Sequence, residues 1–331
     1  MLPQLHLLRL RFDLTLLAAA SFPPYKGDLL RRAMLWHLGT MWCRQPERCR
    51  DGCQSPQTCL FGRLIEPPYN PAWTETLRRM MGDTPPPAYV LWDCQDRRRD
   101  LQPGDNLRFE LTLIGDVAIR QQPAFIAALL VAGEKGLGRD SARAKLSQVD
   151  ALTGAHSTPH PLLIHDVWQG APLDVVVLSY ADGQAWRDAL DYAGDRAITR
   201  LHLRFLSPLN IKQRGQVMTV PAFPAIARAV VRRLRILSQV HGAGEWPHAE
   251  WGGLLDLADT VQLEHHETTW VSSQRRSNRG TMPMAGFVGE AWYTAGTDLR
   301  PLLPALWLGQ WVHIGKTAVW GNGRYAVMNE A

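Results

Sequence analysis

The chain has 331 residues, of which 46% are hydrophobic, so it is long enough for two domains with buried cores. Its 36 Lys and Arg residues exceed its 31 Asp and Glu residues, which gives a formal net charge of +5 and a moderate basic bias consistent with nucleic-acid binding. No stretch approaches the ~20 uninterrupted apolar residues of a membrane span. We therefore expect no membrane partner and a cytoplasmic location, where thiols stay reduced.

The N-terminal segment predicts a strand followed by a helix. Apolar and polar residues alternate from Leu5 to Leu17, which is typical of a strand with one buried face. Asp28 is expected to cap a helix from Leu29 to Met41, whose apolar residues recur along one face. A strand, a loop and a helix in this order open a ferredoxin-like domain.

Four cysteines then lie close together in one loop: Cys43, Cys49, Cys53 and Cys59. In a reducing compartment such a cluster predicts a structural zinc ion held by four thiolates. The spacing differs from the paired Cys-x-x-Cys of zinc ribbons, so free thiols or disulfides remain open as alternatives.

The middle of the chain continues the same plan. Strands are predicted at 88–92 and 107–114, a helix at 122–132 and a strand at 145–149. Gly-Leu-Gly-Arg at 136–139 follows the helix and is similar to the Gly-Asn-Gly-Arg at 321–324. The repeated order of strand, helix and glycine loop indicates an internal duplication.

The second half begins after an irregular connection at 151–195 that encloses one predicted hairpin. A strand is predicted at 200–209 and a helix at 223–240, on which Arg228, Arg232 and Arg235 share one face that either contacts RNA or is solvated. Strand-like segments at 263–266 and 270–273 lead to a basic hairpin tip at 274–280.

The last third contains the strongest pattern. A strand at 286–293 and a helix that follows Thr297 and Asp298 lead into a glycine-rich loop and a final strand at 325–328. Gly315, Gly321 and Gly323 let backbone N–H groups approach a phosphate, and His313, Lys316 and Arg324 can supply charge around it. The glycines follow a helix instead of opening one, which excludes the dinucleotide and P-loop fingerprints.

This C-terminal segment resembles the CRISPR-associated endoribonucleases of the RAMP (repeat-associated mysterious protein) superfamily, which process precursor CRISPR RNA. Their pattern is Gly-Phe-x-Gly, a helix, His-x-Gly-Lys and Gly-x-Gly-Arg. In this chain the matching residues are, in order, Gly286, Phe287, Gly289, His313, Gly315, Lys316, Gly321, Gly323 and Arg324. The segment from Tyr25 to Ala33 resembles the family's first helix, and Ser-Pro-Leu at 207–209 resembles the start of its second domain.

The resemblance implies roles for individual residues. His37 is the expected general acid or base, because in many such ribonucleases this histidine lies on or next to the first helix; packing against the sheet is the alternative. Tyr25, Lys26 and Arg31 are candidates to orient a phosphate or stabilise the transition state. The basic tip, with Arg275, Arg276 and Arg279, is expected to bind the stem of a repeat RNA, and the glycine-rich loop to bind RNA as well.

We therefore predict an α+β chain of two tandem ferredoxin-like (RAMP/RRM-like) domains, at 1–150 and 196–331, with a four-cysteine loop insertion at 43–59. The resemblance implies cleavage of CRISPR repeat RNA by 2′-OH attack, leaving a 2′,3′-cyclic phosphate and a 5′-OH, without a catalytic metal. Repeat RNA and subunits of a CRISPR effector complex are the expected partners. The alternatives are a non-catalytic RAMP subunit that binds guide RNA and a zinc-dependent hydrolase.

Overall fold

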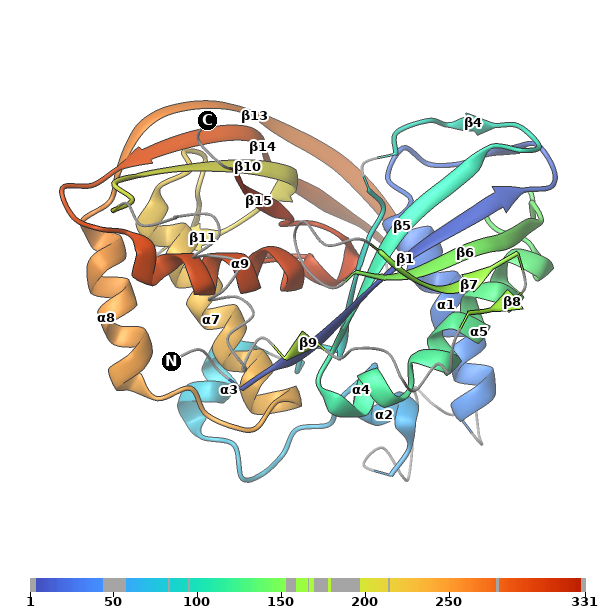
Figure 1. Cartoon of the computed structure of the whole chain (residues 1–331), viewed down its shortest axis with the longest axis horizontal. Helices are drawn as coiled ribbons and strands as arrows, with labels where there is room; N and C mark the ends of the chain where they lie inside the picture. The colour runs from blue at the N-terminus through green and yellow to red at the C-terminus, as the bar shows by residue number, and fades with distance from the viewer. Residues whose placement is uncertain are drawn as a thin grey trace. The chain divides into compact units, whose positions relative to one another are not determined.

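The computed structural model describes residues 4–43, 58–82, 84–94, 96–152, 159–165, 167–169, 178–179, 197–213, 215–277 and 280–328. The chain divides into two compact units (Figure 1). Unit 1 comprises Met1–Leu5, Ser179–Gln239 and Ala243–Ala331, and unit 2 comprises His6–Leu178 and Val240–Gly242. The domain boundaries expected at 150 and 196 remain predictions, because most of the connecting segment lies outside the described residues.

Unit 2 has the order βαββαβ of a ferredoxin-like domain. Its main elements are β1 (His6–Leu16), α1 (Gly27–Trp42), β3 (Tyr89–Trp92), β5 (Asn106–Ile114), α5 (Gln122–Lys135) and β6 (Ala144–Leu152). The antiparallel sheet has the order β3-β5-β1-β6 and continues into β7 (His160–Ile164) and β8 (Val167–Trp168), while β9 (Leu178–Ser179) pairs with β1. The shorter elements are β2 (Ala20–Ser21), α2 (Leu60–Leu64), α3 (Glu75–Met81), β4 (Asp100–Leu101) and α4 (Asp116–Arg120).

The core of unit 2 lies between its sheet and the helices α1 and α5. Leu30, Met34 and Leu38 recur every four residues on α1 and are fully buried, so they form the apolar face that the sequence predicted. Phe12 of β1 stacks on Phe109 of β5, with ring centroids 5.1 Å apart. The cap prediction was wrong: the residue before α1 is Lys26, whereas Asp28 lies in the first helical turn.

Unit 1 repeats the same order of elements. They are β10 (Arg200–Leu209), α7 (Phe223–His241), β13 (Gln262–Ser277), β14 (Gly280–Thr294), α9 (Leu303–Val312) and β15 (Tyr325–Met328). The four-stranded antiparallel sheet has the order β13-β14-β10-β15, which is equivalent to that of β3-β5-β1-β6 in unit 2. The remaining elements are β11 (Lys212–Gln213), β12 (Gln216–Val217), α8 (His248–Asp259), η3 (Arg300–Leu302) and η4 (Ala318–Trp320).

The helices α7 and α9 lie on the same side of this sheet (Figure 1). Phe223 of α7 contacts Tyr293 of β14 edge to face at 5.1 Å, and the Tyr325 hydroxyl of β15 donates a hydrogen bond to the Leu306 carbonyl of α9 at 2.7 Å. The two segments predicted as separate strands at 263–266 and 270–273 form one strand, β13. Its partner β14 stays paired with β10 only as far as Phe287, so residues 273–277 and 280–284 continue as a two-stranded ribbon.

The α+β class with two tandem ferredoxin-like units is thereby confirmed. The four-cysteine insertion is not confirmed, because Cys49 and Cys53 lie outside the described residues. Among the helices in the described part of the chain, none has both the length and the hydropathy needed to cross a membrane.

Candidate nucleic-acid interface

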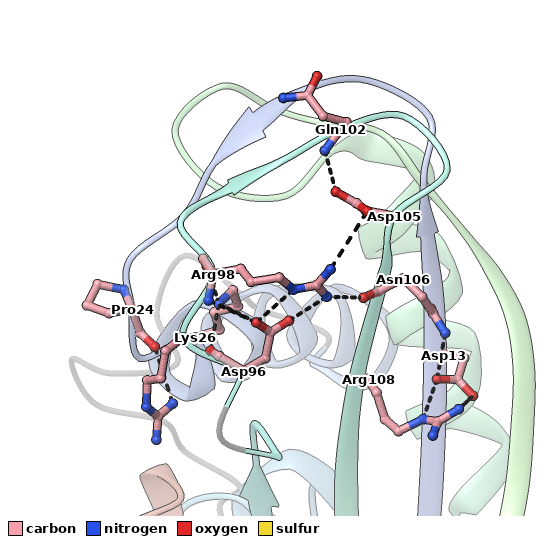
Figure 2. Close-up of polar contacts among 10 residues, drawn as sticks. Asp13, Pro24, Lys26, Asp96, Arg98, Gln102, Asp105, Asn106 and Arg108 are labelled. Atoms are coloured by element: carbon pink, nitrogen blue, oxygen red, sulfur yellow. Dashed lines mark hydrogen bonds and ion pairs between the residues drawn. The ribbon is translucent and has the colours of Figure 1, made fainter.

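The loop before α1 is fixed by a buried lysine (Figure 2). The Lys26 side chain is fully buried, and its Nζ donates to the backbone carbonyls of Asp96 and Arg98, both at 2.7 Å. The Asp96 carboxylate lies 3.5 Å from the same ammonium. Burial lowers the pKa of Lys26, and the charge of Asp96 opposes that shift. Lys26 therefore connects the loop before α1 to the loop between β3 and β4, a placement that keeps its ammonium away from a phosphate.

Tyr25 is held by the same loop. The Arg97 guanidinium lies over the Tyr25 ring, 4.2 Å from its centroid, and donates to Asp93 at 3.1 Å and to the Pro24 carbonyl at 3.2 Å. Asp93 in turn accepts the backbone N–H of Lys26 at 3.0 Å. These contacts give Tyr25 a packing role beside the start of α1.

The network continues from Asp96 toward the sheet. Arg98 donates to both Asp96 oxygens, at 3.2 and 3.0 Å, and to the Asn106 carbonyl at 2.6 Å (Figure 2). Burial alone would raise the pKa of Asp96, but the hydrogen bonds from Arg98 hold it below its usual value. Arg108 and the Asn106 amide both donate to Asp13 of β1, at 2.7 to 3.0 Å. The charged residues labelled in Figure 2 thus connect the loops before α1 and after β3 to the strands β1 and β5.

His37 lies on α1, far along the helix from this network. Eleven residues separate it from Lys26, which is about 16 Å along a helix axis, so the two cannot contact one phosphate. The His37 side chain is partly exposed, and its pKa is lowered first by burial and then by the positive charge of Lys135 on α5. A lowered pKa keeps the imidazole mostly neutral near pH 7, which is the form that accepts a proton.

The other predicted residues of unit 2 lie in separate places. Arg31 is partly buried near the Tyr89 hydroxyl; burial raises the pKa of Tyr89 to about 12, although Arg31 favours the opposite shift. Cys43 and Cys59 are free, partly buried thiols, and the Cys59 thiol lies 3.9 Å from the Trp42 carbonyl. Within the described residues no group of three or more His, Cys, Asp or Glu side chains could hold a metal, so the zinc prediction gains no support.

In unit 1 the glycine-rich loop runs from the end of α9 to β15. Gly315, Gly321 and Gly323 all have positive φ, of 80°, 94° and 70°. A Cβ on Gly323 would lie 1.7 Å from the Ile314 carbonyl oxygen, so only glycine allows this approach. His313 is 2% exposed, and its Nδ1 pairs with the Asn322 carbonyl at 3.1 Å. The loop is therefore a tight turn whose ends are joined by hydrogen bonds, including that from the Ile314 N–H to the Gly323 carbonyl at 3.1 Å.

Arg324, at the C-terminal end of that loop, is buried against α9. It is 6% exposed, its guanidinium lies over the Trp311 ring at 4.2 Å, and it donates to the Gln310 carbonyl. Its backbone N–H donates to the Ser207 hydroxyl at 2.8 Å. The charge predicted to face RNA thus contributes to packing against α9 in this structure.

Lys316 is the exposed cation of the loop. Its backbone N–H donates to the Asn210 carbonyl at 2.9 Å, which brings it beside the short hairpin of β11 and β12. Burial lowers the pKa of Lys316, and the adjacent Lys212 ammonium lowers it further. The sequence interpretation missed Lys212, because no motif marks a lysine in a two-residue strand.

The arginines predicted to contact RNA also occur on β13 and on α7. Arg275 and Arg276 lie on β13, opposite Met282 and Thr281 of β14, and Arg279 lies outside the described residues. On α7, Arg228 donates to both oxygens of Asp259 on α8, and Arg235 lies over the Trp251 ring at 4.1 Å. These two arginines contact α8, so this part of the helix face packs against a neighbouring helix, which neither the RNA-contact nor the solvated-face interpretation had anticipated.

Comparisons with known proteins agree with the fold. A family model described as an N-terminal domain (AF_1859_N) matches residues 5–177, and the model of the CRISPR-associated endoribonuclease Cas6 matches residues 203–325. No curated protein matches the chain.

Solved structures of similar fold cover nearly the whole chain. The Thermus thermophilus Cas6 (TTHB231) structure has a TM-score of 0.51 at 14% identity, and the Cas6 (TTHB231) product complex has 0.54 at 15%; both cover 98% of this chain and 99% of the other. A partial Cas6-RT-Cas1–Cas2 complex has a TM-score of 0.60 at 13% identity and covers 99% of this chain and 47% of the other. The Cas6 model thus matches the second ferredoxin-like unit, and the whole chain shares its fold with the solved Cas6 structures.

Proposed function

We propose that this chain cleaves CRISPR repeat RNA with His37 as the general base. The observation that carries the proposal is a partly exposed imidazole whose pKa is lowered by burial and by Lys135, so that it is neutral and accessible near pH 7. Tyr25 and Lys26 are proposed to fix the start of α1 instead of contacting the phosphate, because both are engaged by the loop between β3 and β4.

In this mechanism the ribose supplies its own nucleophile. His37 accepts the proton of a 2′-OH, and the 2′-oxygen attacks the adjacent phosphorus. The bond from phosphorus to the 5′-oxygen breaks, that oxygen takes a proton from water, and the protonated His37 returns its proton to the solvent. The products are a 2′,3′-cyclic phosphate and a 5′-OH end, and the steps balance without a metal ion.

The decisive assay uses repeat RNA from the chain's own CRISPR locus in excess EDTA, with matched RNAs that carry a single 2′-deoxy at each candidate position. We expect cleavage to persist in EDTA, to vanish at one deoxy position and to slow by about 10²- to 10⁴-fold in His37→Ala. His160→Ala, which removes an exposed histidine of β7, serves as the matched control and should cleave normally.

Three outcomes would contradict the proposal. Loss of cleavage in EDTA would indicate a metal-dependent reaction, in which the cysteine loop becomes relevant. Normal cleavage by His37→Ala would show that His37 is not the general base. Tight, salt-sensitive binding without turnover would identify a non-catalytic subunit that binds guide RNA.

We also propose that repeat RNA and other CRISPR proteins are the partners of this chain. The support is the fold shared with a chain of a partial Cas6-RT-Cas1–Cas2 complex, which is about twice as long as this chain. Co-purification of the tagged chain from its host, followed by mass spectrometry and RNA sequencing, tests both partners at once.

A further inference from the structure

We propose that Lys212 and Lys316 together hold one phosphodiester of the bound RNA, so that the β11–β12 hairpin forms part of the RNA-binding surface. The inference rests on the proposed function, and it assigns a role to a hairpin and a lysine that the glycine-rich motif does not contain.

The backbone fixes the two lysines side by side. Lys316 donates its N–H to the Asn210 carbonyl, only two residues before Lys212. A Cβ on Gly315 would lie 2.5 Å from the same carbonyl oxygen, which shows how closely the loop passes this segment. The backbones of Lys212 and Lys316 are therefore close in space, although about 100 residues separate them in the sequence.

The hairpin is anchored, so Lys212 is not on a loose loop end. Ile211 and Met218 are 7% and 8% exposed, and the Met218 N–H donates to the Ile211 carbonyl at 2.9 Å. Lys212 pairs with Val217 in the next position of the hairpin. Both lysines are exposed, so their ammonium groups are open to a ligand from solvent.

The charge arrangement indicates an anion. Among the described residues, Lys26 forms an ion pair with a carboxylate, that of Asp96, whereas Lys212 and Lys316 form none. The Lys212 ammonium lowers the pKa of Lys316. Two adjacent ammonium groups repel each other, and an anion bound between them offsets that repulsion because it attracts both. A phosphodiester has two non-bridging oxygens, and each can accept a hydrogen bond from one lysine.

The test is a double-mutant cycle on RNA binding. Lys212→Met, Lys316→Met and the double variant keep the aliphatic stem and remove the charge, and Arg79→Met removes an exposed charge from α3 of unit 2 as the control. The probe is repeat RNA that carries 2′-deoxy at the cleavage position, with the dissociation constant measured from 50 to 300 mM salt. Because this RNA cannot react, binding is measured whether or not the chain cleaves.

We expect each single variant to bind roughly fivefold more weakly, as for one exposed charge contact, and the salt slope to fall by about 0.7 to 0.9. The double variant should lose less than the product of the single losses, because the first substitution already relieves the repulsion in the free protein. Arg79→Met should stay within twofold of the original chain.

A second measurement follows the pair without RNA. Titration of the lysine side chains by NMR should show the pKa of Lys316 rising in Lys212→Met. An unchanged Lys316 titration, unaltered RNA affinity in Lys212→Met, or losses that multiply in the double variant would each overturn the shared-phosphate assignment. Failure of the original chain to cleave ribose RNA would instead overturn the proposed function and leave this test intact.

Discussion

Replacing Lys26 by Met separates a structural role of this lysine from a catalytic one. The ammonium is fully buried and donates to two backbone carbonyls at 2.7 Å. Hydrogen bonds from charged donors contribute about 1.5 to 3 kcal/mol each, or about 3 to 6 kcal/mol for the two. Burying the ammonium is itself unfavourable, and this burial lowers the pKa of Lys26. The methionine does not incur this cost, so part of the lost hydrogen-bond energy is offset. We expect a net loss of about 2 to 4 kcal/mol in the unfolding free energy of unit 2.

Thermal melting and urea unfolding measure this loss. For a unit of this size, a destabilisation of about 3 kcal/mol corresponds to a melting temperature lower by about 6 to 12 °C. Arg143→Met, at an exposed position just before β6, is the control and should change stability by less than about 0.5 kcal/mol. A Lys26→Met protein that melts normally but no longer cleaves RNA would refute the reasoning, because it would show the ammonium acting on substrate.

Two further predictions concern the proposed base and the glycine-rich loop. Lys135→Met removes the charge that helps to lower the pKa of His37, so the acidic limb of the cleavage rate should move to higher pH, toward 6.5, in single-turnover assays. A limb that does not move would mean that Lys135 does not act on the base. Gly323→Ala places a Cβ against the Ile314 carbonyl at positive φ and should destabilise unit 1 by about 2 to 4 kcal/mol and weaken RNA binding. Gly296→Ala, with open space around it, is the matched control, and equal stability of the two variants would contradict the assignment.

The sequence predicted those helices and strands whose apolar residues follow a regular spacing within the segment itself. The four-residue spacing on α1 reflects burial of one face, which the segment carries in its own sequence. The strand β1 was predicted correctly, but the expectation of a single buried face was wrong, because β1 lies between β5 and β6 and its polar residues Arg9 and Asp13 are buried as well. The helix α8 was missed, because Gly252 and Gly253 lower its helical propensity. It is held instead by tertiary contacts, those of Arg228 with Asp259 and Arg235 with Trp251.

The candidate site was harder to predict for the same reason. A lysine before a helix and an arginine after Gly-x-Gly both suggest exposed cations. Lys26 is buried and donates to carbonyls about 70 residues further along the chain. Arg324 is buried against the Trp311 ring and donates to the Gln310 carbonyl. Long-range pairing of this kind leaves no trace in a short window of sequence. His37 was named from the resemblance to the family, and its role remains a prediction.

The ribbon formed by residues 273–277 and 280–284 has a consequence for engineering. It extends past the last residue of β10 that pairs with β14, so its length is independent of the sheet that supports it. Each residue of an antiparallel strand advances about 3.4 Å, and side chains return to the same face every second residue. Deleting or inserting two residues in each strand would therefore move the tip by about 7 Å while the pairing partners and faces stay matched. The length of this ribbon can therefore be changed in steps of two residues per strand without altering the pairing in the rest of the sheet.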